Sequence, residues 1–279
     1  MNTHRVLIAS YKKDFVWLPY CLRTLSKFSR GFLPPVVSVS TEDAAEATEI
    51  CVLNYPGATV FVKDGPPGLG NLRAQISMMN GDILCPGADY VWLVGSDCVV
   101  SREFTPEPFF RNGKPVMLVN SYAELFRCSL AMKPWQDGTE NAIGWKPELE
   151  YMRRLPLIYP RELFPRVRGH VSNVHQMPFE EYVYGIGARA QASDRSDAAN
   201  FSESNVMGAF ADRFMHDSYE WVNLDADYVG EMAKLPSPLI QFWSHGGLST
   251  VSDVCFNYGN GKTTCGQTPR TVIRDILSQ

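Results

Sequence analysis

The segment from Tyr90 to Val100 (YVWLVGSDCVV) places one acidic residue, Asp97, directly after an apolar run. An acid at the end of a hydrophobic strand costs free energy unless it has a partner. A divalent cation is one such partner, because carboxylate oxygens suit hard ions such as magnesium and manganese. The alternative is that Asp97 only stabilises the turn after the strand. The segment by itself does not separate these two interpretations.

A second candidate group is Arg73, near the start of an expected helix from Asn71 to Asn80. A guanidinium close to a helix N-terminus can bind a phosphate group. The alternative is a solvated surface arginine. The preceding loop (GPPGLG, 65–70) is not a dinucleotide-binding fingerprint, because Arg73 stands where a third glycine is needed.

These groups must be positioned by the elements around them, and the first half of the chain alternates strand and helix patterns. Expected strands span residues 5–9, 36–40, 59–62 and 90–94, with a break at Pro34 and Pro35. Expected helices span residues 14–28 and 71–80, and another begins with Thr41 as its N-cap. Such repeated units imply an α/β fold with a mainly parallel central sheet flanked by helices. The loops after Ala9, Val62 and Val94 should then share one crevice at the carboxyl ends of the strands.

The second half of the chain is less regular. It predicts a strand over 117–120, helices over 145–154, 161–174, 179–189 and 203–214, a strand over 239–243 and a short helix in the tail 266–279. No linker or internal repeat interrupts the sequence. We therefore expect one domain over residues 1–279, made of a half 1–100 and a half 101–279.

Composition narrows the function classes. The formal net charge is −4, whereas a protein that grips duplex DNA usually carries a basic excess. This disfavours nucleic acid without excluding a local basic patch. The 7 cysteines include no Cys-x-x-Cys pair, which indicates buried free thiols in a reducing cytosol. No apolar segment reaches the length of a signal peptide or a membrane span, so we expect a cytoplasmic protein.

The segment that ends in Gly95-Ser96-Asp97 resembles the acidic DxD region of GT-A-type glycosyltransferases, in which an apolar strand ends in an acid-containing triplet. In that family the acids hold a metal ion on the diphosphate of a nucleotide-sugar donor. Gly95 replaces the first acid, so only Asp97 matches as a metal ligand, and Ser96 is a candidate donor contact. The resemblance implies a GT-A-like (nucleotide-diphospho-sugar transferase) fold and a divalent cation, manganese or magnesium.

His245, in the segment 242–247 (FWSHGG), is similar to a C-terminal histidine that supplies a further metal ligand in several GT-A enzymes. A neutral imidazole is a competent ligand for manganese-like ions. The alternative is a histidine that is hydrogen-bonded within a turn.

The resemblance also implies a set of donor-binding residues. In GT-A proteins the loop after the first strand receives the nucleoside. Here that loop contains Ser10, Tyr11 and Asp14, of which Tyr11 can stack on a base and Asp14 can accept a hydrogen bond from an imide or a ribose hydroxyl. Asp14 could instead, or in addition, cap the first helix. On the helix before the acidic segment, Gln75 and Arg73 are the expected donor contacts.

Glu203 is the candidate catalytic base. The segment 201–208 (FSESNVMG) resembles a helix start in a small group of bacterial and phage GT-A-like proteins, which includes enzymes that modify phage DNA. In an inverting enzyme a carboxylate there can deprotonate the acceptor hydroxyl. The alternative is ordinary helix chemistry, with Ser202 as the N-cap and Glu203 in the first turn.

The sequence thus predicts a glycosyltransferase that uses a nucleotide-diphosphate sugar, with a uridine (UDP) donor implied by the resemblance. The acceptor is open: hydroxymethylated pyrimidine in bacteriophage DNA, or a saccharide. The locally basic stretch 161–168 could contact a phosphate-bearing acceptor or be a solvated helix face. The alternatives are a non-catalytic nucleotide- or sugar-binding protein on the same scaffold, and a sugar nucleotidyltransferase, which the lack of glycine after the first strand disfavours.

Overall fold

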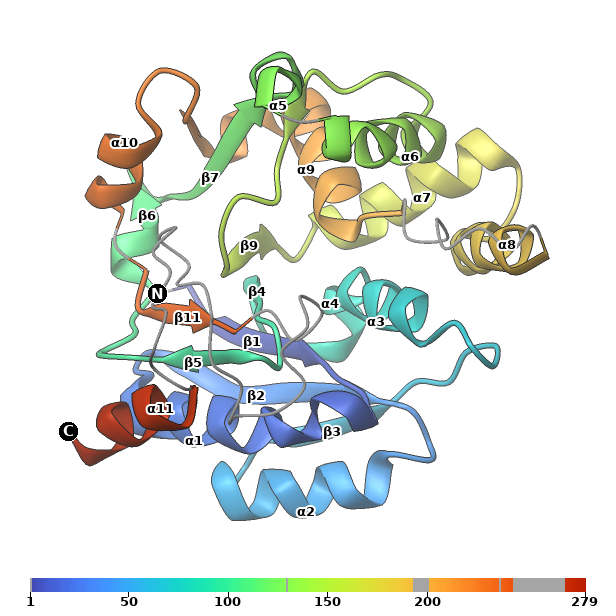
Figure 1. Ribbon diagram of the computed structural model, residues 1–279. Helices are drawn as coiled ribbons and strands as arrows, with labels where there is room; N and C mark the ends of the chain where they lie inside the picture. Colours follow the sequence, from blue (N-terminus) through green and yellow to red (C-terminus); the bar gives the residue numbers. More distant parts are fainter. Residues whose placement is uncertain (1, 129, 193–200, 236, 243–268) are drawn as a thin grey trace.

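The central sheet has the strand order β3-β2-β1-β4-β9 (Figure 1). The computed structural model describes residues 2–128, 130–192, 201–235, 237–242 and 269–279. Four strands of the sheet run parallel, and the last pairs antiparallel with β4. Their bounds are β1 His4–Ala9, β2 Phe32–Val39, β3 Thr59–Val62, β4 Tyr90–Leu93 and β9 Leu157–Pro160. The predicted α/β fold with a mainly parallel sheet flanked by helices is confirmed.

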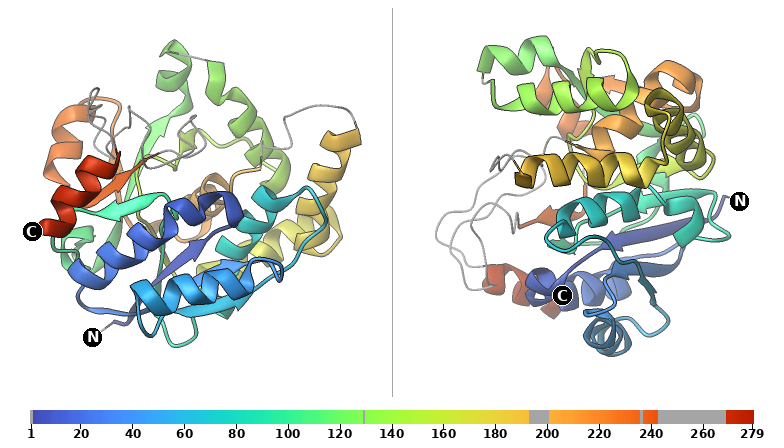
Figure 2. Two further views of the ribbon diagram at one scale, coloured as in Figure 1. Left: turned by 60° about the horizontal axis from the view of Figure 1, so that its bottom comes forward. Right: turned by 90° about the vertical axis from the view of Figure 1, so that its right-hand side faces the viewer.

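Alternate residues of the central strands bury opposite faces of the sheet. Val6 and Ile8 of β1 pack in a core with residues of α1 (Leu18–Phe28) and α2 (Ala44–Asn54). Leu7 points to the other core, which it shares with residues of α3 (Gly70–Met78), α7 (Leu163–His175) and α9 (Glu203–Phe214). Helices therefore cover both faces, as the two turned views also show (Figure 2).

The second half of the chain adds smaller sheets. β7 (Lys114–Ser121) pairs parallel with β10 (Glu220–Asn223) and antiparallel with β6 (Phe110–Arg111) and β8 (Leu149–Glu150), while β5 (Cys98–Val100) pairs antiparallel with β11 (Leu239–Gln241). The other α-helices are α4 Gly81–Leu84, α5 Tyr122–Cys128, α6 Lys133–Ile143, α8 Phe179–Ala192, α10 Tyr228–Lys234 and α11 Pro269–Ser278. Short 3-10 turns span Lys12–Val16, Glu107–Phe109, Leu130–Met132 and His216–Ser218. Because β9 and β11 pair with β4 and β5, strands from both halves share their sheets.

The predicted helix over 145–154 is wrong. That segment forms β8 and a loop, since the backbone N–H of Tyr151 donates to the side chain of Asn205 (2.9 Å) instead of to a helical carbonyl. The helix lies earlier, in α6, and ends at Gly144, whose φ of 85° is the left-handed conformation typical of a helix C-terminus. Its glycine stop and the proline in its first turn were readable signals in the sequence.

Two boundaries near the sheet also differ from the prediction. Pro34 and Pro35 do not break the chain but lie in β2, where the register with β1 shifts and the pairing with β3 has not yet begun. A proline is tolerated there because no ladder hydrogen bond needs its missing N–H. Thr41 does not cap α2. Its backbone N–H and hydroxyl donate to Asp64 (2.8 and 2.5 Å), and the helix starts at Ala44.

Among the described residues, no helix has the length and apolar character needed to cross a membrane.

Candidate functional site

The carboxyl ends of the parallel strands are held together by the side chain of Arg73. Its guanidinium donates to the backbone carbonyl of Ser10 after β1 (2.9 Å) and to that of Lys63 after β3 (3.4 Å). Arg73 is only 4% exposed, so it is not the solvated surface arginine of the alternative interpretation. Its observed contacts join two loops of the sheet edge, and a contact with a phosphate group stays a prediction.

Asp43, in the loop after β2, and Asp64, in the loop after β3, fix the same edge. The Asp43 carboxylate accepts from the backbone N–H of Lys12 (3.2 Å) and from the hydroxyl of Ser40 (3.0 Å). Asp64 accepts from Thr41, and these hydrogen bonds hold the pKa of the Asp64 carboxyl below its usual value. The loops after β1, β2 and β3 are therefore cross-linked by side chains.

Ser96 and Asp14 join the first loop to the acidic loop after β4. The hydroxyl of Ser96 donates to the Asp14 carboxylate at 2.9 Å, and both side chains are buried. Tyr11 lies close enough to Asp14 and Asp97 that their charges add to its burial in raising its pKa to about 12. The structure thus brings these four predicted residues to one end of β1 and β4.

Ser10 is fully buried at this edge. Its backbone N–H donates to Ser38 (2.9 Å), and its hydroxyl has no hydrogen-bond partner among the described residues. Ser10 therefore acts on the observed site through its backbone, as the acceptor for Arg73.

Gln75 and Glu203 meet at the border between the two halves. The side-chain oxygen of Gln75, on α3, accepts a hydrogen bond from the backbone N–H of Glu203, the first residue of α9 (3.2 Å). Ser202 accepts from the backbone N–H of Asn205 (3.2 Å), so the predicted N-cap is confirmed. Ser202 is thus the N-cap, and Glu203 stands in the first turn, where backbone N–H groups of the helix start and the Ser204 hydroxyl donate hydrogen bonds to its carboxylate.

The Glu203 carboxylate is held in a desolvated environment. Burial raises its pKa, while a hydrogen bond from the hydroxyl of Ser204 (2.9 Å) acts in the opposite direction. A carboxyl whose pKa is raised towards neutrality suits general base or acid catalysis.

The binding of a metal ion stays a prediction. Asp97 offers hard oxygen ligands beside buried Asp14, but no cluster of three or more His, Cys, Asp or Glu side chains suited to a metal occurs among the described residues. His245 lies outside these residues. The set fits a magnesium or manganese ion held by one or two carboxylates and by substrate phosphates, and it does not form a closed all-protein site.

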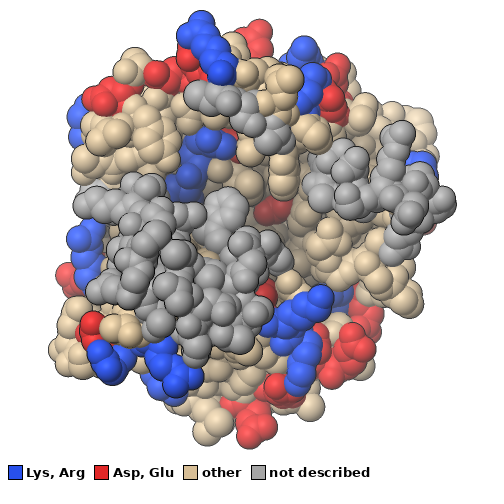
Figure 3. Space-filling view, viewed as in Figure 1, with Lys and Arg blue, Asp and Glu red and all other residues tan. Residues whose placement is uncertain are grey.

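The surface on this side of the molecule is hollowed near its middle (Figure 3). Both basic and acidic side chains line the visible part of the hollow, which lies between the half containing β1 to β3 and the half containing α6 and α9 (Figures 1 and 3).

The basic stretch 161–168 is partly engaged. Arg168 forms a two-pronged ion pair with Asp82 (2.6 and 2.9 Å) and donates to the carbonyl of Met79 (2.6 Å), so it fastens α7 to α4. Arg161 and Arg166 are exposed. Arg161 and Arg166 therefore fit the alternative of a solvated surface, whereas Arg168 does not.

Sequence reasoning missed the loop that joins β8 to β9, which carries Arg153 and Arg154 beside the buried Glu150. The incorrect prediction of a helix over 145–154 placed both arginines in a helix instead of in this loop. The dipeptide of two arginines between the apolar residues Met152 and Leu155 was the available signal.

No model of a known protein family matches the chain, and no curated protein matches it closely.

Proposed function

We propose that the protein is a GT-A-type glycosyltransferase that transfers a sugar from a nucleotide-diphosphate sugar, a UDP-sugar being the expected donor, to an acceptor hydroxyl. The observation that carries the proposal is the contact between Gln75 and Glu203 (3.2 Å). It joins the donor-side helix α3, which follows the sheet edge, to the residue with the raised carboxyl pKa. Donor binding and proton removal can then occur within one hollow.

In the proposed reaction the Glu203 carboxylate removes the proton of the acceptor hydroxyl as the hydroxyl oxygen bonds to the anomeric carbon. The bond from that carbon to the diphosphate breaks, and the nucleoside diphosphate leaves with the electron pair. Attack from the face opposite the leaving group inverts the anomeric configuration. A divalent cation bound at Asp97 would neutralise charge on the departing diphosphate.

The donor would be positioned by the loop after β1. Tyr11 is partly exposed and offers a ring for stacking on a base, and Asp14 is fixed by Ser96 (2.9 Å) next to it. Arg73 keeps this loop in place through the carbonyl of Ser10. A rigid cross-linked loop lowers the entropy cost of holding the donor in a reactive geometry.

The acceptor is a hydroxyl compound, and DNA carrying hydroxymethylated pyrimidine is the acceptor that the sequence resemblance favours. The net charge of −4 gives no general attraction for a duplex. A saccharide is the alternative acceptor.

A non-catalytic nucleotide-binding protein is the second candidate function. It is favoured by one observation, the incomplete acidic triplet Gly95-Ser96-Asp97, in which the first acid is missing. Binding without turnover would need the same donor-side residues but no role for Glu203.

The test is a thermal-shift screen of nucleoside diphosphates and nucleotide sugars, with and without manganese. Differential binding to the folded state must raise the melting temperature. We expect a manganese-dependent shift with a uridine nucleotide that is lost in Asp97→Ala and reduced in Asp14→Asn, while Glu162→Gln, an exposed control, keeps it.

Donor hydrolysis then separates catalysis from binding. We expect the wild type to release UDP slowly from its donor and Glu203→Gln to bind the donor but release none. A shift without any release in wild type would favour the binding protein, and no shift with any nucleotide would overturn the proposal.

A further inference from the structure

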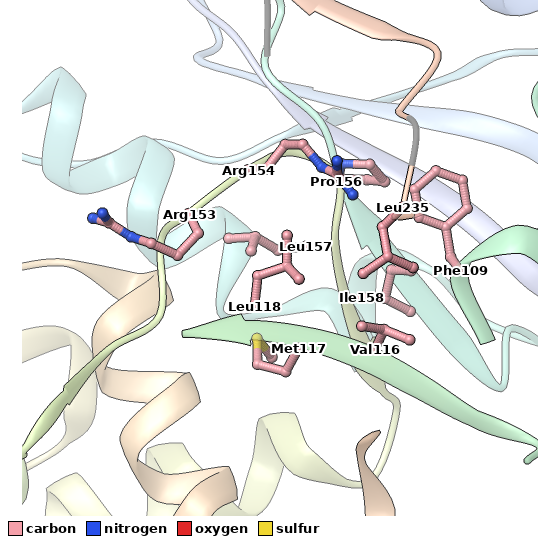
Figure 4. A pocket seen from close by; sticks show the side chains of 10 residues that line it. All are labelled: Phe109, Val116, Met117, Leu118, Arg153, Arg154, Pro156, Leu157, Ile158 and Leu235. Atoms are coloured by element: carbon pink, nitrogen blue, oxygen red, sulfur yellow. The ribbon is translucent and has the colours of Figure 1, made fainter. Parts of the chain in front are cut away.

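The loop between β8 and β9 carries two adjacent arginines with different surroundings. Figure 4 shows their side chains leaving the loop in different directions, with Arg154 on the side of Pro156. Arg153 forms an ion pair with Glu150, whose side chain is 1% exposed. Arg153 therefore compensates the charge of the buried Glu150.

Arg154 has no ion-pair partner among the described residues, and its Nη1 atom is buried there without a hydrogen bond. It lies against a pocket with largely apolar walls, among them Phe109, Pro156 and Leu235 (Figure 4). Burial lowers the pKa of Arg154 to about 10, with only Tyr228 acting in the opposite direction. A half-buried cation without a counter-charge costs free energy in the folded protein, and a bound anion would offset that cost.

The sheet places Arg154 at the same edge as the acidic loop. β9 runs antiparallel to β4, with Leu157 opposite Leu93, so the residues before β9 lie beside those after β4. The side chain of Leu155 comes within 3.6 Å of where a Cβ on Gly95 would be. The backbone just before β9 therefore lies beside the loop 95–97, and Arg154 directly precedes the residue that makes this contact.

The guanidinium of Arg73 at this edge is already engaged, since it donates to the backbone carbonyls of Ser10 and Lys63. A guanidinium offers a planar set of donors that matches phosphate oxygens. Arg154 is the cation at the β9 side of this edge for which no carboxylate partner exists among the described residues.

We propose that Arg154 binds a phosphate group of the donor's diphosphate and stabilises it as the leaving group. The identity of the donor rests on the proposed function, whereas the recognition of a phosphate oxyanion at Arg154 does not.

The test is isothermal titration of inorganic pyrophosphate and, separately, of UDP into metal-free protein. Removing divalent cations leaves only the protein's own charges to bind the anion. We expect Arg154→Gln to bind both at least about tenfold more weakly than wild type, the loss of one charge-assisted contact. The control Arg166→Gln removes an exposed arginine of α7 and should leave both affinities unchanged.

The unfolding temperature without ligand distinguishes a binding role from a structural one. If Arg154 is an uncompensated charge, Arg154→Gln is as stable as wild type or more stable, and pyrophosphate stabilises only the wild type. If Arg154→Gln does not fold, Arg154→Met, which keeps the apolar stem of the side chain, is used to distinguish a binding role from a structural one. Unchanged pyrophosphate affinity in a folded Arg154 variant would overturn the proposal, as would a wild type that binds neither anion. Arg154-dependent binding of pyrophosphate with no stronger binding of UDP or any nucleotide sugar would support the phosphate site and count against the proposed function.

Discussion

The side-chain oxygen of Gln75 accepts a 3.2 Å hydrogen bond from the backbone N–H of Glu203, although 128 residues separate the two in the chain. The contact ties the first turn of α9 to α3 and so sets where the Glu203 carboxylate stands relative to the loops of the sheet edge. The first N–H groups of a helix have no partner within the helix. Gln75 satisfies one of them from a neighbouring element.

Replacing Gln75 by Leu should therefore lower kcat, because Glu203 loses the hydrogen bond that fixes the start of α9, and a rise in the donor KM would accompany it if Gln75 also contacts the donor as predicted. One hydrogen bond of this kind contributes about 1 kcal/mol to stability, so the fold should persist. The readouts are steady-state kinetics and the melting temperature.

Gln136→Leu is the matched control, since the side chain of Gln136 also makes one hydrogen bond to the backbone, here as the donor to the carbonyl of Pro147 (2.8 Å), but lies on α6. It should cost similar stability and leave kcat unchanged. Equal kinetic losses in both variants would contradict a positioning role for Gln75.

Gly208 allows α9 to approach the ring of Tyr151 closely. A Cβ at position 208 would lie 2.3 Å from the nearest ring atom, far inside van der Waals contact. Gly208→Ala should destabilise the protein by about 1–3 kcal/mol, the usual cost of overpacking a core. Denaturant unfolding measures this loss.

Gly70→Ala is the control for glycine replacement in general, because no atom lies within 4 Å of its Cβ position at the start of α3. It should be neutral or slightly stabilising, since alanine restricts the unfolded chain. A Gly208→Ala variant as stable as Gly70→Ala would show that α9 can move away from Tyr151 at little cost.

Local patterns predicted α9 and the parallel strands well. The helix 203–214 and the strand 59–62 have the predicted bounds, because the N-cap Ser202 and the apolar periodicity are both local signals. The edge that unites Ser10, Tyr11, Asp14, Ser96 and Asp97 followed from the general rule for parallel sheets. The sequence could therefore indicate which loops meet, though not which atoms touch.

The remaining features depend on pairs far apart in the chain. Nothing local in Arg73 says that it donates to Ser10, and nothing in Ser96 points to Asp14, 82 residues away. The segment 145–154 has a helical pattern, but tertiary contacts of Tyr151 with Asn205 and Gly208 override it. Arg154 stayed unnoticed for the same reason, since its neighbourhood is created by the pairing of β9 with β4.

Acid sensitivity should arise in part from His4. The ring Nδ1 accepts a hydrogen bond from the indole of Trp92 (3.2 Å), and burial lowers the pKa of His4. Below the usual histidine pKa of about 6.5, the unfolded chain therefore binds more protons than the folded one. Stability then falls as the pH drops below that value, and His4 does not affect it well above that value. His4→Gln, which keeps an acceptor for Trp92, should flatten the decline of unfolding free energy between about pH 7 and pH 5. An identical decline in both proteins would rule out this source.

Glu203→Gln should lower turnover but raise the stability of the folded protein at neutral to high pH, because the ionised carboxylate is desolvated. Burial raises the pKa of Glu203, so in the window between the unfolded carboxyl value of about 4.3 and the raised folded value the native state binds more protons. Stability then falls as the pH rises through that window, and the loss persists above it.

The Glu203→Gln variant should match wild type in stability near pH 4 and be more stable near pH 8. It should lose turnover by about 10²–10⁴-fold, the range expected for a general base. Glu181→Gln removes an exposed acid of α8 and should change neither property. Urea unfolding across this pH range tests the predicted stability, and donor turnover tests the predicted loss of activity. A variant that is less stable than wild type at pH 8 would instead show that the ionised carboxylate has a stabilising partner.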